Sequence, residues 1–184
     1  AEAAFDTAYA ESLGMPIHRV DFGKSLETVE DLFEDLEKVI AGSRGQPELY
    51  IVDSLDALSD RAELARDMDE GTYGAQKAKN LSQMFRRTVR RLGRAHVTIM
   101  IISQVRSKIG SSFGRGTTRS GGRALDFYAS QALWLSLMKT QTTTVRLIKR
   151  AVALTIRARC KKNKISLPLR ECEFTLSFGY GIED

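Results

Sequence analysis

Two short, uninterrupted apolar runs restrict the fold of this chain more than any other feature of its sequence. They occupy residues 49–52 and 97–102, and both are rich in β-branched side chains. Runs of this length, apolar on both faces of an extended chain, are typical of buried parallel strands. One helical pattern precedes the first run and a second lies between the two runs, so helices and strands alternate along the chain. This alternation predicts an α/β fold with a mostly parallel central sheet flanked by helices.

Both helical patterns are amphipathic. The first repeats apolar residues at three- and four-residue spacing from Leu26 to Ile40, and we expect Ser25 to be its N-cap and Gly42 to lie near its end. The second, predicted over residues 75–92, carries alanine, leucine and phenylalanine inwards and most of its arginines outwards. Its polar face is therefore basic.

The amino-acid composition changes abruptly over residues 103–122, where five glycines occur among serines, threonines and basic residues. We expect a long flexible loop at the end of the second apolar run, and loops of this length are usually functional or disordered. Beyond it, the pattern predicts a short helix over 124–130 and antiparallel strands within 132–138, 144–159 and 173–178, with turns near Thr140 and Asn163. No repeat or linker divides the chain, which predicts a single domain over residues 1–184.

Charge is strongly segregated along the chain. Residues 1–70 carry 18 acidic and 6 basic side chains, residues 71–125 carry none and 12, and residues 126–184 carry 5 and 10. A stretch with twelve cations and no carboxylate should attract a polyanion, and nucleic acid is the first candidate. The alternative is a basic surface that pairs with the acidic first third or is simply hydrated.

Several classes of protein are excluded or disfavoured. No apolar run approaches the roughly 18 residues that a membrane span needs, and no signal sequence is recognisable at the N-terminus. Cys160 and Cys172 are too few for a disulfide framework and have no metal-ligand spacing with His18 or His96. We therefore expect a soluble protein in a reducing compartment, the cytoplasm, with no membrane partner.

The first apolar run ends in Asp53-Ser54, which has the form of a Walker B element. A strand of this kind delivers its carboxylate to the carboxyl edge of the sheet, where it can hold a Mg²⁺-bound water beside nucleotide phosphates. An N-cap for the following segment is the simpler alternative for the same residues.

A phosphate-binding P-loop is not recognisable in this chain. The motif requires G-x-x-x-x-G-K-[ST] between a strand and a helix. Gly23-Lys24-Ser25 offers only its last part, since His18 stands where the first glycine is needed. We interpret these residues as a turn and an N-cap, and we expect this chain alone to bind ATP weakly or not at all.

A family resemblance appears in residues 101–130. The order of Gln104, Arg106, Lys108-Ile109-Gly110, Phe113-Gly114, Gly121-Gly122 and Phe127-Tyr128-Ala129-Ser130 resembles the second DNA-binding loop and following helix of the bacterial RecA recombinases. The first residues of the chain, the Walker B run and residues 162–182 agree in the same order, whereas residues 139–159 do not. The resemblance implies a RecA-like P-loop NTPase core with an antiparallel C-terminal extension, from which the P-loop strand and helix and the small C-terminal lobe are absent.

The resemblance assigns roles around a nucleotide, with ATP and Mg²⁺ as cofactors. Glu2 is similar to the carboxylate that polarises the attacking water, and Gln104 to the sensor of the γ-phosphate. Lys162 and Lys164 resemble the pair that reaches the neighbouring protomer's phosphates, a solvated basic turn being the alternative. Asp6 and Tyr9 resemble the adenine contacts. Asp53 and Ser54 match the Walker B acid and its neighbour.

The resemblance also assigns contacts to DNA and to the next protomer. The second-loop contacts are Arg106, Lys108, Phe113, Gly121 and Gly122, where cations and main-chain amides can follow phosphates. The first-loop contacts are Tyr73, Lys79, Ser82 and Arg86, although the spacing to Ser82 departs by one residue from the family pattern. Phe127 resembles the apolar residue that inserts into the next protomer, with burial in the core as the alternative.

These observations lead to one preferred hypothesis and two alternatives. The preferred one is the DNA-dependent ATPase core of a recombinase that forms helical filaments on single-stranded DNA and exchanges strands with a homologous duplex. A non-catalytic DNA-binding or filament-associated module would explain the missing P-loop, but it gives no reason for the retained Glu2, Asp53, Gln104 and lysine pair. A hexameric helicase-type motor fits the Walker B strand but not the glycine-rich loop.

Overall fold

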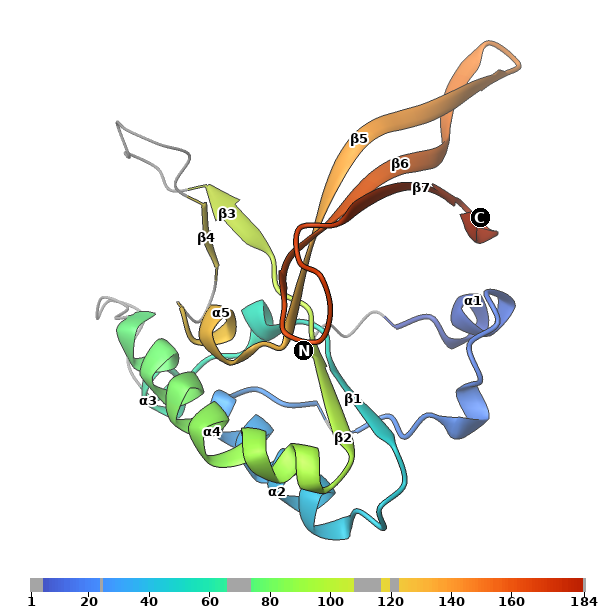
Figure 1. Cartoon of the computed structure of the whole chain (residues 1–184). Helices are drawn as coiled ribbons and strands as arrows, with labels where there is room; N and C mark the ends of the chain where they lie inside the picture. Colours follow the sequence, from blue (N-terminus) through green and yellow to red (C-terminus); the bar gives the residue numbers. More distant parts are fainter. Residues whose placement is uncertain (1–4, 24, 66–73, 108–116, 120–122, 184) are drawn as a thin grey trace, which may run out of the picture. The chain divides into compact units, whose positions relative to one another are not determined.

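The computed structural model describes residues 5–23, 25–65, 74–107, 117–119 and 123–183, and these form two compact units (Figure 1). Unit 1 comprises the described residues of Gly23–Tyr128. Unit 2 comprises Phe5–Phe22 and the described residues of Ala129–Asp184. Within the described ranges, no helix is long and apolar enough to span a membrane.

Unit 1 is built on two parallel strands with two long helices against them. Strand β1 (Glu48–Val52) pairs with β2 (Val97–Ile101) in register from Glu48 opposite Val97 to Val52 opposite Ile101. Helices α2 (Val29–Gly42) and α4 (Gly74–Arg94) lie on one side of this pair (Figure 1). The α/β class predicted from the alternating patterns is confirmed, although only these two strands of the described residues are parallel.

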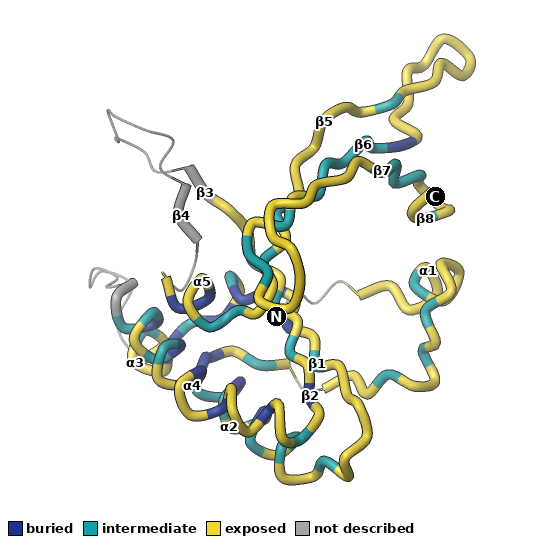
Figure 2. The backbone as a smooth tube through the Cα atoms, viewed as in Figure 1, coloured by how far each residue is buried: buried dark blue, intermediate teal, exposed yellow. Residues whose placement is uncertain are grey.

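The core of unit 1 lies between the helices and one face of the strands. Figure 2 shows the buried segments along the facing sides of α2 and α4. The most deeply buried large side chains come from α2, from α4 and from the turn after β1, and include Leu32, Leu36, Leu55 and Leu81. Burying each of these contributes about 2 kcal/mol relative to exposure.

The prediction that both faces of the apolar strands are buried is wrong for the described residues. Leu49 and Ile51 of β1 are 56% and 48% exposed, whereas Val52 is buried and Tyr50 packs against the core. The reason is that α2 and α4 cover only one face of the pair. Side chains alternate along a strand, so every second apolar residue points to the face without a helix among the described elements.

Helix α2 begins three residues later than its apolar pattern predicts. Its N-cap is Thr28, whose Oγ1 accepts a hydrogen bond from the Asp31 main-chain N–H while Asp31 Oδ2 accepts one from the Thr28 N–H, each at 3.1 Å. This reciprocal capping box satisfies two donors that would otherwise be unpaired. Ser25, the predicted N-cap, is exposed and lies outside the helix, so that prediction is wrong.

Short elements connect the main ones in unit 1. They are the 3₁₀ turn η2 (Leu55–Ala57), α3 (Arg61–Leu64), the antiparallel strands β3 (Val105–Ser107) and β4 (Thr117–Arg119), and α5 (Ala124–Tyr128). Strands β3 and β4 lie within the segment 103–122, for which a long flexible loop was predicted, and the flexibility of this segment stays a prediction. Residues at both ends of that segment pair as a short ribbon, which fixes the chain where it leaves Gln104.

Unit 2 is an antiparallel sheet in the order β5-β6-β7-β8, as expected for the C-terminal part. Its strands are β5 (Gln131–Val145), β6 (Ile148–Asn163), β7 (Glu171–Ser177) and β8 (Gly181–Glu183). The predicted turn near Thr140 is wrong, because β5 continues to Val145. The chain reverses at Arg146 and Leu147, whose φ angles of 49° and 66° are in the left-handed region. The short helical elements α1 (Thr7–Ser12) and η1 (Ile17–Arg19) also belong to this unit.

The two faces of this sheet differ in chemistry. Leu133, Leu135 and Leu137 follow one another on one face of β5, and each is more than 60% exposed. On the other face, Arg157 and Arg159 of β6 pair with Glu173 and Glu171 of β7 at 2.7 and 2.8 Å. These exposed ion pairs are cross-strand neighbours and favour the observed register over a shift by one residue.

The cap of α2 gives the first testable prediction. We expect Thr28→Ala to lower the free energy of unfolding by about 1 kcal/mol, because it leaves the Asp31 main-chain N–H without its partner. Ser25→Ala is the matched control and should leave stability unchanged. Urea denaturation of both variants measures the difference, and equal losses would show that the helix does not depend on the Thr28 cap.

Candidate active site and nucleic-acid interface

The carboxyl ends of β1 and β2 bring three predicted site residues to one edge of the sheet. Asp53 and Ser54 follow β1 directly, and Gln104 lies three residues beyond β2. The pairing continues past the strands, since the Ile102 N–H donates to the Val52 carbonyl and the Leu55 N–H to the Ile102 carbonyl, both at 3.0 Å. Asp53 and Gln104 are exposed, Ser54 is buried, and the Asp53–Ser54 peptide bond is cis.

Asp56 is a second carboxylate at this edge that the sequence analysis missed. Its Oδ2 accepts a hydrogen bond from the main-chain N–H of Gln104 at 2.7 Å. Its Oδ1 is buried and has no hydrogen-bond partner within the described part of the chain. The available signal was an acidic residue three positions after Asp53, in the turn that follows a Walker B strand.

A buried lysine of α4 also holds this turn. Lys77 is only 8% exposed, and its ammonium donates to the carbonyl oxygens of Leu55, at 3.0 Å, and of Leu58. A buried cation is tolerated only when such partners replace water. The turn after Asp53 is thus bonded both to Gln104 and to α4.

Asp53 is chemically suited to contact Mg²⁺ through a metal-bound water. Asp53 is exposed and directly follows β1, where its carboxylate can accept hydrogen bonds from metal-bound water. Within the described ranges, no three acidic, histidine or cysteine side chains converge to form a metal cage. This donor set fits an ion whose remaining ligands are water and phosphate, and it does not fit a site made of protein alone.

Asp6 and Tyr9 lie together at the start of α1. Asp6 is the N-cap of this helix, and its Oδ1 accepts from the Tyr9 main-chain N–H at 2.9 Å. The Tyr9 side chain is 46% exposed, which leaves a ring face available for stacking. The cap explains the proximity of the two residues without a ligand, so their adenine role stays a prediction.

Lys162 and Lys164 lie at the end of β6 and just beyond it. Lys162 pairs in register with Ala132 of β5, and the Lys164 main-chain N–H donates to the Ser130 carbonyl at 2.9 Å. Burial lowers the pKa of the Lys162 ammonium, and the nearby charge of Lys164 lowers it further. The charge of Lys164 thus acts on Lys162, and the role of the pair at a phosphate stays a prediction.

Helix α4 presents an exposed basic face. Lys79, Ser82 and Arg86 share one side of the helix, and Arg90 continues it one turn beyond Arg86. Among the described residues, neither Arg86 nor Arg90 has an ion-pair partner, whereas Arg91 pairs with Glu37 of α2 at 2.5 Å. Arg90 was not predicted, although its spacing from Arg86 was visible in the sequence.

The remaining predicted DNA contacts are only partly placed. Arg106 lies in β3, where its backbone is paired with Thr118 of β4. The other positions predicted from the resemblance fall outside the described residues, and they are Glu2, Tyr73, Lys108, Phe113, Gly121 and Gly122.

Phe127 of α5 is not a core residue. Its side chain is 72% exposed and meets the neighbouring Tyr128 ring edge-on at 4.9 Å between centroids. Tyr128 instead faces the core, where its ring lies 5.7 Å from that of Phe85. Exposure excludes the core alternative, and the predicted insertion into a second protomer stays a prediction.

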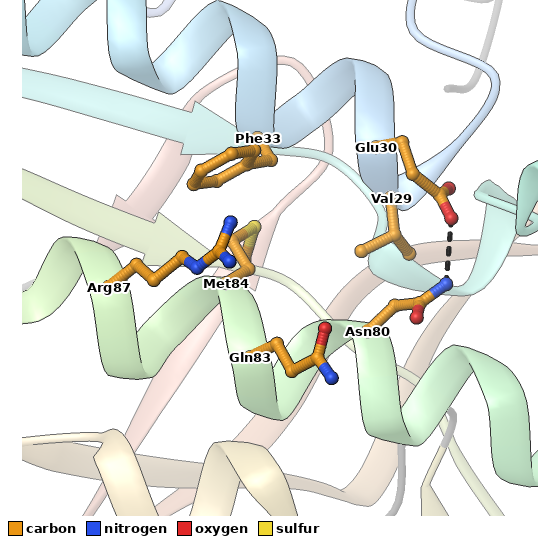
Figure 3. Close-up of a pocket in the computed structure, with 7 residues that line it drawn as sticks. All are labelled: Val29, Glu30, Phe33, Asn80, Gln83, Met84 and Arg87. Atoms are coloured by element: carbon orange, nitrogen blue, oxygen red, sulfur yellow. Dashed lines mark hydrogen bonds between the residues drawn. The ribbon is translucent and has the colours of Figure 1, made fainter.

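A shallow groove runs between α2 and α4 (Figure 3). Asn80 Nδ2 donates to Glu30 Oε1 at 2.7 Å, and the Arg87 guanidinium lies 5.9 Å from the centre of the Phe33 ring. These polar groups are engaged with each other across the groove. None of the predicted site residues lines it, so we treat it as the contact between two helices.

The lysine pair yields a prediction about proton binding. We expect Lys164→Gln to raise the pKa of Lys162, but to leave it below the ordinary lysine value, because burial is the larger cause of the shift. The measurement is an NMR titration of the Lys162 side chain. The control is Lys161→Gln, which removes an ammonium stacked 3.2 Å from the Trp134 ring centre and should not move the Lys162 pKa. A Lys162 pKa that rises in Lys161→Gln but not in Lys164→Gln would show that Lys164 is not the charge that lowers it.

Comparison with known proteins shows the family of the chain. The model of the RecA N-terminal domain matches residues 1–183. Curated proteins named Protein RecA from Delftia acidovorans, Cereibacter sphaeroides and Prochlorococcus marinus are 34%, 33% and 36% identical to it, each over 99% of the chain. The chain covers 47%, 51% and 48% of these proteins, so it spans about half the length of the relatives that it matches. The resemblance inferred from the Gln104 segment and its neighbours is thereby confirmed, and the chain belongs to the RecA N-terminal domain family.

Proposed function

We propose that the protein containing this chain is a DNA-dependent ATPase that assembles on single-stranded DNA and promotes strand exchange with homologous duplex DNA in repair. One observation carries the proposal. The sheet edge that holds Asp53 is hydrogen-bonded, through Asp56, to the main chain of Gln104, directly before the ribbon that carries Arg106. A nucleotide at this edge would therefore lie next to a segment suited to DNA contact.

The proposed nucleotide chemistry divides among several groups. Asp53, with Ser54 beside it, orients a water bound to Mg²⁺, and Glu2 polarises the attacking water. Gln104 senses the γ-phosphate, and Asp6 with Tyr9 contacts the adenine. Lys162 and Lys164 act on the nucleotide of the neighbouring protomer and stabilise the charge that develops on the transferred phosphoryl group. When bound, ATP and Mg²⁺ supply the phosphoanhydride bond and the Lewis acid.

The proposed DNA surface combines the basic face of α4 with the ribbon after Gln104. Lys79, Arg86 and Arg90 offer cations without protein partners among the described residues, as phosphate contacts require. Further contacts are proposed for Tyr73, Ser82, Arg106, Lys108, Phe113, Gly121 and Gly122. Phe127, exposed on α5, is proposed to contact the next protomer in a filament.

The non-catalytic module remains the second candidate, because no P-loop is recognisable between residues 1 and 184. The two candidates differ in one measurable respect. A recombinase ATPase hydrolyses ATP faster when single-stranded DNA is added, and a binding module does not hydrolyse it. The retained Asp53, Gln104 and lysine pair favour the first candidate, since binding DNA alone requires none of them.

Salt dependence tests the DNA surface. In the intact protein, we expect Arg86→Ala to weaken binding of single-stranded DNA equally for all sequences and to reduce the slope of log affinity against log salt by about 0.7, the value for one lost phosphate contact. Arg91→Ala is the matched control, because its guanidinium is already paired with Glu37. Equal slopes in wild type and Arg86→Ala would show that this face of α4 does not contact phosphate.

Subunit mixing tests the lysine assignment. Lys162→Ala and Lys164→Ala should each slow DNA-dependent hydrolysis while nucleotide binding by a single protomer is kept, because the lysines act on the neighbour's nucleotide. Lys161→Ala is the control. In mixed assemblies, a mutant protomer whose nucleotide faces the lysines of a wild-type neighbour should hydrolyse that nucleotide at the wild-type rate. Sites that stay slow with wild-type neighbours would show that the lysines act within their own protomer.

A further inference from the structure

The turn after Asp53 is anchored more strongly than a surface turn requires. Its first residue, Leu55, is fully buried and bonded through its N–H to Ile102. Two side chains then link it to distant parts of the sequence. Lys77 of α4 donates to two carbonyl oxygens of the turn, and Asp56 of the turn accepts the Gln104 N–H.

Lys77 is unlike the other cations of α4. Lys79, Arg86, Arg87, Arg90, Arg91 and Arg94 are exposed, whereas Lys77 is buried and directed at the turn. A methionine or leucine would fill this position at lower desolvation cost if packing were its only task. The ammonium adds a directional link between the first turns of α4 and the main chain that follows Asp53.

Asp56 supplies the corresponding link to the second strand. An acidic side chain in a surface turn is normally hydrated, yet this carboxylate accepts a main-chain N–H of the segment that leads from β2 to β3. Hydrogen bonds to a charged acceptor are stronger than neutral ones. The bond therefore fixes the backbone from which the Gln104 side chain projects.

We propose that Asp56 and Lys77 are positioning residues that join the nucleotide edge of the sheet to both DNA-contacting segments through the turn between them. Asp56 sets the main chain of Gln104 against the turn, and Lys77 sets the start of α4 against the same turn. A shift of the turn on nucleotide binding would then move both segments together. This inference rests on the proposed function.

Hydrogen exchange tests the structural part of the proposal without any activity. In the intact protein, Asp56→Ala should accelerate exchange of the Gln104 amide about tenfold or more, because the bond to a charged acceptor is lost. Asp56→Asn keeps an oxygen that can accept the same N–H and should restore most of the protection. An unchanged exchange rate in Asp56→Ala would overturn the proposed role of Asp56.

The catalytic part is tested by the ratio of hydrolysis rates with and without single-stranded DNA. We expect Asp56→Ala and Lys77→Met each to lower this ratio about tenfold, as small displacements of catalytic groups do, and Asp56→Asn to lower it less. The matched control is Asn80→Ala, which removes a hydrogen bond from α4 to Glu30 without touching the turn, and it should keep the wild-type ratio. Circular dichroism and thermal unfolding establish that each variant is folded.

A double-mutant comparison separates positioning from general destabilisation. If Asp56 acts through Gln104, adding Asp56→Ala to Gln104→Ala should not lower the ratio further. Losses that multiply would overturn the inference, as would a wild-type ratio in folded Asp56→Ala or Lys77→Met protein. Wild-type protein whose hydrolysis is not stimulated by DNA would instead refute the proposed function, and the exchange experiment would still decide whether Asp56 fixes Gln104.

Discussion

The parallel pairing of β1 with β2 is the interaction on which the rest of unit 1 depends. Parallel strands end at the same edge of a sheet, so this pairing alone brings the chain after Val52 beside the chain after Ile101. Main-chain hydrogen bonds carry the pairing onward through Ile102 and Leu55. Short turns then place Asp53, Asp56 and Gln104 at the same edge, where the Asp56 carboxylate accepts the main-chain N–H of Gln104. The buried leucines of α2 and α4 hold this pair from one side, and the polar edge is left open to solvent.

Some of the segregated charges form ion pairs in the fold, and others do not. Part of the acidic first third is neutralised locally, since Arg61 bridges Asp31 and Glu34 at 2.7 Å and Arg91 pairs with Glu37. Ion pairs as exposed as these contribute little to stability. Among the described residues, Arg86 and Arg90 on the basic face of α4 have no ion-pair partner. The alternative that the basic segment simply neutralises the acidic one therefore accounts for Arg91 but not for Arg86 and Arg90.

Periodicity in the sequence was sufficient to predict the main helices, both apolar strands and the antiparallel C-terminal part, and the order of motifs around Gln104 was sufficient to indicate the family. Periodicity was not sufficient where a single local interaction decides the outcome. The start of α2 depends on the reciprocal hydrogen bonds of Thr28 and Asp31. The length of β5 depends on a turn in which two residues have left-handed backbone conformations although neither is glycine. At the site, the end of the first apolar run predicted Asp53, and the family resemblance predicted Gln104. Asp56 and Lys77 were not predicted. The acidic residue after the Walker B strand was visible in the sequence, but the partners of both side chains are main-chain atoms that only the tertiary fold brings within reach.

The reversal at Arg146 and Leu147 has a practical consequence for work on this protein. Strand β7 pairs with β6 only from Ala153 to Arg159, so the ribbon from Thr142 to Ala151 is held by its own two strands alone. Leu147, at its tip, is 97% exposed. A fluorophore or an affinity peptide inserted between these two turn residues would disturb no contact of the four-stranded sheet below it. The tip is thus a suitable attachment point for labelling the protein in single-molecule imaging.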